Sequence, residues 1–474
     1  MLLRNNILLL FLALFSAPVL YATHNVGGEI LYRKTGPLTV EAWIITYTNA
    51  YAVNVDRDTL TICWGDGVCE KLLRANGNGE GELIAPQYKK NIYLGTHTYT
   101  QAGQFTISMT DPNRSAGIIN VNAPTSDNVP FHIESTISFL SEATGSLNSP
   151  VLLEIPLDDG LVGQPYIHVP SAFDADGDSL AYEFAIPMQD TGTAVPNYVF
   201  PSDIVPGSNN TMTIDPLTGK IVWDAPQTAG HYTIAILVKS YRNGQLVETI
   251  IRDMLIHIDN GANSAPVVEL SVPDNEVLDV FVGDTVQVDM TATDPDAGQM
   301  LELSSSSGLY DFFQDSAQFA VLGQGTARFT WVVTPEHLRE QPYLVVFKAK
   351  DDGSGFAGSP LPDANDEGGL ATFKVAVFRV RQTVSVRPDL AAVTPLRIYP
   401  NPVTGEGLVE VPQPASGPLR LRVLDGQGGV VLEEQISSGA TSHPLRLTHL
   451  PSATYVVQMT EADGAIWLGR VVKQ

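Results

Sequence analysis

The sequence has few cysteines, few basic residues and no long apolar run after its first residues. Only two of its 474 residues are cysteine, Cys63 and Cys69. The apolar run at residues 7–15 is too short to span a bilayer, and no later segment is apolar for long enough. The nine histidines are scattered, and neither H-E-x-x-H nor G-x-S-x-G occurs. These absences argue against a membrane-spanning chain and against the common metalloprotease and serine hydrolase sites.

Basic residues are scarce between residues 23 and 396, where 20 of them stand against 45 acidic residues. From Arg397 onward the charge is nearly balanced, with 6 basic and 7 acidic residues. Nucleic acids and anionic membranes bind basic patches, so this composition argues against both as partners. An acidic surface instead suits solvation or the chelation of cations.

Sustained helical periodicity is also missing. Apolar and polar residues alternate instead, in segments rich in β-branched and aromatic residues that are separated by turn residues. The clearest of these segments are residues 40–53, 105–111, 231–240, 343–350 and 371–380. They predict an all-β protein of tandem Ig-like β-sandwich domains with a small C-terminal β-sandwich. Only TPEHLREQ has the capping residue, Thr334, and the early proline of a short helix.

An internal repeat divides the acidic region. LNSPVLLEIP recurs as NSAPVVELSVP, and FDADGDSLAYEF recurs as TDPDAGQMLEL, which gives a unit of about 115 residues. The repeat places boundaries near residues 146 and 261. The predicted order is a signal peptide at 1–22, domains at 23–145, 146–261 and 262–380, a linker at 381–395 and a last domain at 396–474.

Residues 1–22 have the features of a secretory signal peptide, because Arg4 precedes the short apolar run and SAPVLYA ends at Ala22. Export would place Cys63 and Cys69 in an oxidising compartment, where they could pair, although C-x5-C is also compatible with two free thiols. The glycine turn WGDG between them can place two strand cysteines opposite each other at disulfide distance. We therefore expect a disulfide.

The last domain opens with Tyr399-Pro400-Asn401-Pro402, continues with the strand LRLRVL and the turn DGQGG, and has the basic end Arg470 to Lys473. It resembles the type A sorting domain of the bacterial type IX secretion system. In that family the domain directs the protein across the outer membrane and is usually removed. The resemblance implies the type IX machinery as a partner and a secreted or outer-surface location. An ordinary terminal Ig-like domain is the alternative.

CWGDG and HTYTQAGQFTISM in the first domain resemble a PKD-type Ig-like module. THNVGGEILYR, DPNRSAGIIN and PFHIES extend a resemblance to the N-terminal region of gliding-motility-associated surface proteins over residues 23–259. The glycines of WGDG suit positive φ, and Asp66 can hydrogen-bond the backbone, so we assign Asp66 a structural role. His97 and His231 each lie near a tyrosine at a strand start, and we expect them to be packing residues.

The second and third domains resemble cadherin-like and related Ig repeats through clusters of acidic residues. Loop oxygens in such clusters suit Ca²⁺, which takes six to eight oxygen ligands. The resemblance implies one calcium site shared by Asn260, Asp294, Asp296, Asp351 and Asp352. It also implies a weaker site at Asp174, Asp176 and Asp178, where SYRNG stands in place of the family's A-x-D-x-G. Asx turns that only begin a strand are the alternative for each cluster.

These features predict a secreted, non-catalytic surface protein, stiffened by Ca²⁺, that adheres to a protein or glycan or acts as a spacer. The alternative is a polysaccharide-binding or hydrolytic accessory protein with a site in loops of the first domain. A concave pocket with aromatic walls and two facing carboxylates would favour that alternative. GSGFAG fits a dinucleotide motif, but no helix follows it, so we exclude that function.

Overall fold

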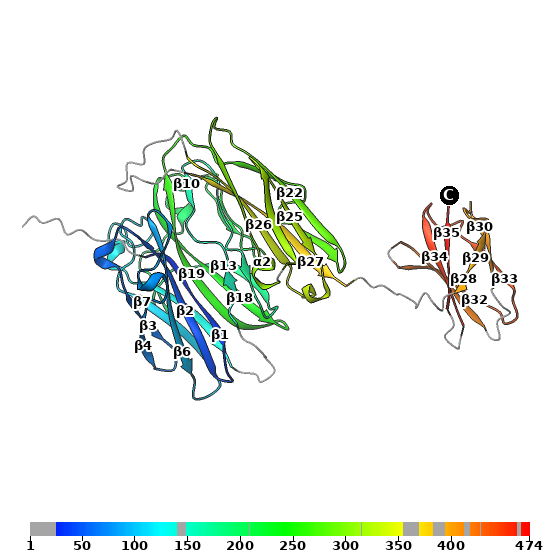
Figure 1. The fold of residues 1–474 in the computed structure, drawn as a ribbon, viewed down its shortest axis with the longest axis horizontal. Helices are drawn as coiled ribbons and strands as arrows, with labels where there is room; N and C mark the ends of the chain where they lie inside the picture. Colours follow the sequence, from blue (N-terminus) through cyan, green and yellow to red (C-terminus); the bar gives the residue numbers. More distant parts are fainter. Residues whose placement is uncertain are drawn as a thin grey trace, which may run out of the picture. The chain divides into compact units, whose positions relative to one another are not determined.

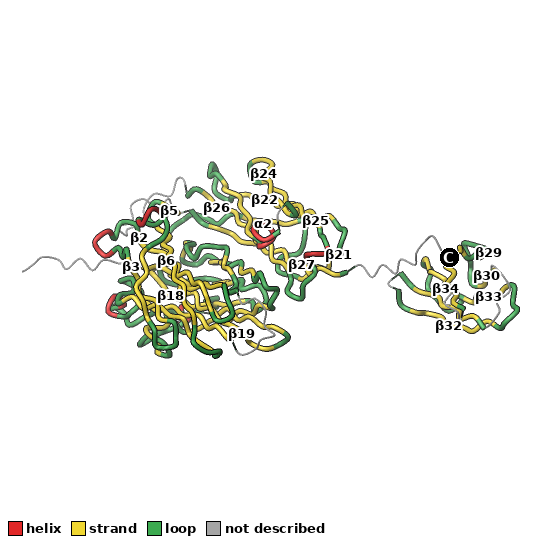
Figure 2. Tube along the Cα trace, turned by 60° about the horizontal axis from the view of Figure 1, so that its bottom comes forward, coloured by secondary structure: helices red, strands yellow, loops and turns green. Residues whose placement is uncertain are grey.

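The computed structural model describes residues 25–139, 148–207, 209–313, 315–353, 369–382, 394–411, 418–426, 428–461 and 466–474. The predicted signal peptide, most of GSGFAG and most of the predicted linker lie outside these residues. The chain divides into two compact units, one ending at Thr383 and the other running from Val384 to Gln474. Strands dominate both units, and helices are few and short (Figure 2). The all-β prediction is confirmed.

One sheet joins the first two predicted domains. Its main path runs β4-β3-β7-β8-β19-β1-β2-β6-β5, and of these strands only β19 comes from the second domain. The bounds are β1 (Asn25–Lys34), β2 (Thr39–Asn49), β3 (Thr59–Cys63), β4 (Cys69–Leu73), β5 (Glu82–Ala85), β6 (Tyr88–Thr98), β7 (Gln104–Asp111), β8 (Phe131–Ser138) and β19 (Gln245–Asp259). β19 pairs antiparallel with both β1 and β8. Figure 1 shows β19, in green, beside the blue strands of the first domain. The predicted boundary near residue 146 therefore does not separate two sheets.

β1 contributes to two hydrophobic cores, one on each of its faces. Ile30 and Tyr32 belong to the core of the first domain, whereas Leu31 and Val26 belong to the core of the second. Gly28 allows close packing here, because a Cβ atom at this position would lie 2.7 Å from the Ile45 carbonyl oxygen. A strand that is apolar on both faces is stable only inside a layered structure. The first two domains are therefore packed together through β1 and its neighbours.

The second domain is built around a long hairpin. β18 (Gly230–Arg242) pairs with β19, and β13 (Ser179–Ala185) pairs with β18. Its shorter strands are β9 (Val151–Leu152), β10 (Asp159–Leu161), β11 (Tyr166–His168), β12 (Ala172–Phe173), β14 (Met188–Asp190), β15 (Thr193–Ala194), β16 (Met212–Ile214) and β17 (Ile221–Trp223). Trp223 is fully buried in the core that these elements enclose.

The third domain is a sandwich of two four-stranded sheets. One sheet contains β20 (Val267–Leu270), β22 (Thr285–Thr293), β25 (Thr326–Val332) and β24 (Ala317–Gly323). The other contains β21 (Val277–Phe281), β27 (Ala371–Arg381), β26 (Tyr343–Asp351) and β23 (Leu301–Ser306). Trp331 and Phe347 are fully buried between the two sheets.

Two short helical elements of the third domain differ from the sequence prediction. The segment predicted as a short helix from Thr334 contains only a 3₁₀ turn, Pro335–His337, although Thr334 does form a capping box with His337. The helix α2 (Gly308–Phe312) was not predicted. It begins after Ser307, whose side chain accepts a hydrogen bond from the Leu309 amide. Five residues are too few for a helical hydrophobic pattern, so only the capping serine could have indicated it.

The third domain packs against the second through an apolar cluster and a buried ion pair. The cluster contains Val169 of the second domain with Leu344, Val346, Phe373, Val375 and Val377 of the third. Beside it, Lys348 Nζ lies 2.6 Å from Asp158 Oδ1, and His168 Nδ1 lies 2.8 Å from Asp158 Oδ2. Although burial opposes ionisation, Lys348 and His168 lower the pKa of Asp158. This contact makes residues 25–382 one compact body.

The C-terminal unit is a separate small β-sandwich, as predicted. One sheet contains β28 (Thr394–Pro395), β35 (Ile466–Val472), β34 (Thr454–Thr460), β31 (Leu419–Leu424) and β32 (Val430–Ile436). The other contains β29 (Arg397–Tyr399), β30 (Glu406–Glu410) and β33 (Ser442–Arg446). Its own core, which includes Val409, Leu421 and Val457, allows it to fold independently.

Candidate cation-binding sites and the sorting domain

The joint site is the calcium site predicted at Asn260, Asp294, Asp296, Asp351 and Asp352. It lies where the linker between the second and third domains meets the loops of the third. Asp294 Oδ1 accepts a hydrogen bond from the Asp296 amide, and Asp296 Oδ2 accepts one from the Ser264 amide, both at 2.7 Å. Asp351 is buried and accepts hydrogen bonds from the Asn263 side chain and from two backbone amides. Burial and neighbouring carboxylates raise the pKa values of Asp294 and Asp351. The structure thus brings these predicted residues together.

The fourth predicted acid of the joint site, Asp352, lies near enough to Asp294 to contribute to the raised pKa of that carboxyl. The amide of Asp352 donates to the Met300 carbonyl at 3.1 Å, which ties the end of β26 to the residue before β23. This backbone contact holds Asp352 and Asp351 beside the Asp294 turn.

The linker residue that reaches this cluster is Asn263, whereas the predicted Asn260 is exposed. Asn263 Nδ2 lies 3.1 and 3.2 Å from the two oxygens of Asp351. Between the two asparagines, Gly261 lies against the Leu161 side chain of the second domain. Asn263 is therefore the linker residue whose contact with the cluster the structure shows, and Asn260 stays a prediction.

In the second domain, Asp174, Asp176 and Asp178 form the corresponding turn. Asp174 Oδ1 accepts hydrogen bonds from the amides of Asp176 and Asp178, at 2.9 and 3.0 Å. Asp176 accepts two bonds from Asn148, from its backbone amide at 2.8 Å and its side-chain amide at 2.7 Å. Arg242, from the SYRNG segment, donates to both oxygens of Asp178 at 2.6 and 2.7 Å. Arg242 thus occupies the third position of SYRNG, where the cadherin-like pattern A-x-D-x-G has its aspartate.

One cluster of acidic residues in the described part of the chain brings three carboxylates within reach of a single metal ion. Asp174, Asp178 and Glu248 each place an oxygen within 4.8 Å of the others, and all three side chains are buried. Glu248 lies within β19 and was not predicted, because a single glutamate inside a strand has no local motif. Burial raises the pKa of Asp174 to about 6, and it raises the pKa of Glu248 well above its usual range. This triad could hold a metal ion.

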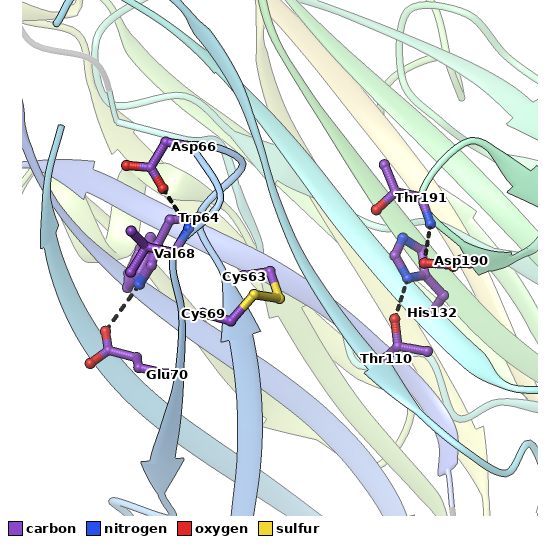
Figure 3. The surroundings of a disulfide bond; sticks show 10 residues. All are labelled: Cys63, Trp64, Asp66, Val68, Cys69, Glu70, Thr110, His132, Asp190 and Thr191. Carbon is purple, nitrogen blue, oxygen red and sulfur yellow. Dashed lines mark hydrogen bonds between the residues drawn. A yellow bond between two sulfur atoms is a disulfide. The ribbon is translucent and has the colours of Figure 1, made fainter. Parts of the chain in front are cut away.

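The two cysteines form a disulfide, as predicted (Figure 3). Cys63 and Cys69 are direct partners in the β3–β4 ladder, with their Cα atoms 4.1 Å apart. Between them, Gly65 and Gly67 have φ angles of 83° and 93°, which only glycine adopts readily. Asp66 Oδ1 accepts a hydrogen bond from the Val68 amide at 3.1 Å and so stabilises the turn.

Both histidines that were expected to pack do lie against other rings. His97 stacks on Trp64, with ring centroids 5.0 Å apart, and its Nε2 atom lies 2.7 Å from Asp66 Oδ2. The His231 ring lies 4.9 Å from the His257 ring. The contact between His97 and Asp66 was not predicted, because the two residues are 31 positions apart.

A cleft of about 570 Å³ lies beside the joint cluster, between the first and third domains. Its described lining residues are Ala85, Pro86, Gln87, Met300, Leu301, Glu302, Lys350, Asp351, Asp352 and Gly369. None of these residues is aromatic, although three are acidic. Among its described lining residues, the cleft therefore has no aromatic wall of the kind that we expect of a polysaccharide site.

The sorting motif begins at the end of β29, in the C-terminal unit. The Tyr399–Pro400 and Asn401–Pro402 peptide bonds are both cis. The Asn401 side chain donates to the Arg470 carbonyl at 2.7 Å and accepts from the Val472 amide at 2.9 Å. The motif is therefore fixed to the last strand, β35, which carries the basic end of the chain.

Solved structures similar to this chain include titin domains, a protocadherin extracellular domain and an endo-fucoidan hydrolase. Titin domains z1z2 in complex with telethonin are 16% identical, with 45% of this chain and 98% of that chain covered and a TM-score of 0.18. The protocadherin GammaB4 extracellular domain is 10% identical, with coverages of 88% and 60% and a TM-score of 0.18. The endo-fucoidan hydrolase MfFcnA4 is 14% identical, with coverages of 68% and 39% and a TM-score of 0.17. At these values no functional argument follows.

A comparison with curated protein sequences finds no match. None of the helices in the described part of the chain combines the length and apolarity that a membrane span requires. Residues 397–474, however, match the family model of the secretion system C-terminal sorting domain. This match agrees with the motif at Tyr399 and with the independent core of the C-terminal unit. The chain is therefore cargo of the type IX secretion system, exported to the cell surface or beyond, with all-β domains ahead of its sorting domain.

Proposed function

We propose that residues 25–382 act outside the cell as a rigid, non-catalytic module for adhesion or spacing. The observation that carries this proposal is the continuous packing of its three domains. β19 lies between β8 and β1 in the first sheet, and an apolar cluster joins the second and third domains. Domains joined by buried apolar contacts keep a fixed relative position, which suits a protein that presents a surface at a set distance. The resemblance of residues 23–259 to gliding-motility-associated surface proteins supports the location outside the cell.

We propose further that Ca²⁺ binds at the joint cluster, with Asp294, Asp296 and Asp351 as acidic ligands. Asp294 Oδ2 is buried and has no hydrogen-bond partner among the described residues. Burial and the carboxylates of Asp296 and Asp352 raise the pKa of Asp294, so negative charge is concentrated here. Oxygen ligands of this kind suit Ca²⁺, and extracellular modules bind it with Kd values of about 10⁻⁴ to 10⁻³ M.

Thermal unfolding of the full chain with Ca²⁺ or with a chelator tests the calcium site. At about ten times the Kd, one bound ion adds about 1.4 kcal/mol to the free energy of unfolding. The melting temperature should then rise by about 3 °C. Asp351→Asn should abolish this rise. Asp289→Asn is the matched control, because Asp289 is an exposed aspartate of the same domain that pairs with Arg328. Equal melting curves with calcium and with chelator would contradict the site.

A binding screen tests the proposed role at the cell surface. The full chain should bind a surface glycan or a surface protein without changing it chemically. The cleft between the first and third domains is the first place to probe, with Met300→Ala, because Met300 is 66% exposed at its edge. Release of reducing sugar from a polysaccharide by the purified chain would show that the proposal of a non-catalytic module is wrong.

A further inference from the structure

We infer that Asp174, Asp178 and Glu248 form a buried site for a hard divalent cation, separate from the calcium site proposed at the joint. The three side chains are 0%, 4% and 1% exposed, and each contributes an oxygen within 4.8 Å of the other two. They come from two parts of the second domain, the turn before β13 and the strand β19. Oxygen-only ligands of this kind select hard cations.

Two oxygens of the triad point to a missing partner. Asp174 Oδ2 and Glu248 Oε1 are buried, and neither has a hydrogen-bond partner of normal geometry among the described residues, although the Ser240 hydroxyl lies near enough to Glu248 to act on its pKa. The other oxygen of each side chain is satisfied: Asp174 Oδ1 accepts two backbone amides, and Glu248 Oε2 lies 2.5 Å from the Tyr32 hydroxyl. Buried carboxylate oxygens without partners are strongly unfavourable. A cation between these two oxygens removes that cost.

The charges around the triad are also unbalanced. Four carboxylates interact here, those of the triad and of Asp176, and the guanidinium groups of Arg242 and Arg339 act on them. Arg242 pairs with Asp178, and Arg339 donates to the Asp174 carbonyl at 3.0 Å. With all of these groups ionised, the cluster has two more negative than positive charges. One divalent cation compensates that difference.

Asp176 is not part of this site, although it lies in the same turn as Asp174 and Asp178. Both of its oxygens accept hydrogen bonds from Asn148. Tyr32 instead belongs to the surroundings of the site, because its hydroxyl group orients Glu248 and also lies 2.9 Å from the Thr136 carbonyl. Tyr32 and Thr136 are residues of the first domain. A cation here would therefore link the second domain to the first through Glu248.

Metal analysis of the full secreted chain tests this site. All variants carry Asp351→Asn, which removes the proposed ion at the joint from the count. Each protein is loaded with Mn²⁺ during refolding, treated with EDTA, desalted and analysed by mass spectrometry. The parent should retain about one Mn²⁺ per chain, because a buried site with three carboxylates releases its ion slowly. Glu248→Gln should lose that ion, whereas Asp176→Asn, the matched control from the same turn, should retain it.

Two outcomes would overturn the inference. The parent protein could fold and yet retain neither Mn²⁺ nor Ca²⁺, which would mean that protons neutralise the triad. Alternatively, Asp176→Asn could lose the ion while Glu248→Gln retains it, which would place the ion at the turn alone. If Glu248→Gln does not fold, Asp174→Asn takes its place. The metal content of the parent protein still decides whether the chain holds an ion outside the joint site. Neither outcome depends on the calcium site at the joint, which Asp351→Asn has removed.

Discussion

Replacing Glu29 by glutamine should destabilise the first and second domains together. Glu29 in β1 and Arg252 in β19 form a fully buried pair, with Nε–Oε2 and Nη2–Oε1 distances of 3.0 and 2.7 Å. Arg252 also donates to the Glu154 carbonyl at 2.6 Å. Glutamine keeps the volume of the side chain but removes its charge, so Arg252 loses its buried ion-pair partner.

The expected loss is about 3 to 5 kcal/mol in the free energy of unfolding, as for other buried pairs that lose one partner. Residues 25–259 unfold with an entropy of roughly 0.5 kcal/mol per kelvin, at about 2.1 cal/mol/K for each residue. The melting temperature should therefore fall by about 6 to 10 °C. The matched control is Glu41→Gln in β2, which breaks an exposed pair with Arg33 and should cost less than about 1 kcal/mol.

Tryptophan fluorescence of the two cores is the assay. Trp64 lies in the core of the first domain and Trp223 in that of the second, and both are fully buried. Urea unfolding is followed in two backgrounds that retain only Trp64 or only Trp223, with the other four of the five tryptophans replaced by phenylalanine, so that each core can be read separately. Glu29→Gln should move both transitions by the same amount, because β19 belongs to both domains. A shift confined to one transition would refute the shared sheet as the structural unit.

Two further predictions concern the sorting domain and the Asp158–Lys348 ion pair between the second and third domains. Asp158→Asn should destabilise the chain most at neutral pH: the folded-state pKa of Asp158 is lowered, so its contribution is complete above about pH 4 and declines as the pH falls toward that pKa. Denaturant midpoints at pH 7 and pH 3 should show the difference from wild type shrinking, and an equal difference at both would contradict it. Deleting residues 396–474 should leave the remaining chain folded but trapped in the periplasm, because the tail has its own core. Normal surface levels of the truncated chain would show that the tail is not required for sorting.

The strand pattern and the tail could be predicted from the sequence because their signals are local. The alternating segments at residues 343–350 and 371–380 became β26 and β27, and the YPNP motif identified the sorting domain. The pairing of β1 with β19 could not be predicted in the same way. It joins residues more than two hundred positions apart, and pairing of that range depends on tertiary packing. The consecutive apolar residues Ile30, Leu31 and Tyr32 were the available signal, because they indicate a strand buried on both faces.

The candidate cation sites were predicted in part for the same reason. The D-x-D turns are local motifs, and both form the expected hydrogen bonds to the backbone. Glu248 was missed because no neighbour in sequence indicates a ligand, and Asn263 was missed although it lies in the same linker as the predicted Asn260. Arg242 shows the opposite case: SYRNG departed from the family pattern, and the structure shows its arginine paired with Asp178.

The joint between the second and third domains limits what calcium can add to its rigidity. The resemblance of the acidic cluster to cadherin-like calcium sites favours a joint that is loose without calcium, because the carboxylates would repel one another there. The structure adds six buried apolar side chains there, together with the Asp158–Lys348 pair. Their burial contributes on the order of 10 kcal/mol at about 1.5 to 3 kcal/mol for each side chain, against about 1.4 kcal/mol from one weakly bound ion. Small-angle scattering of residues 23–380 should therefore give the same maximum dimension in calcium and in chelator, even where the melting temperatures differ. A longer particle in chelator would mean that the apolar contact opens without the ion.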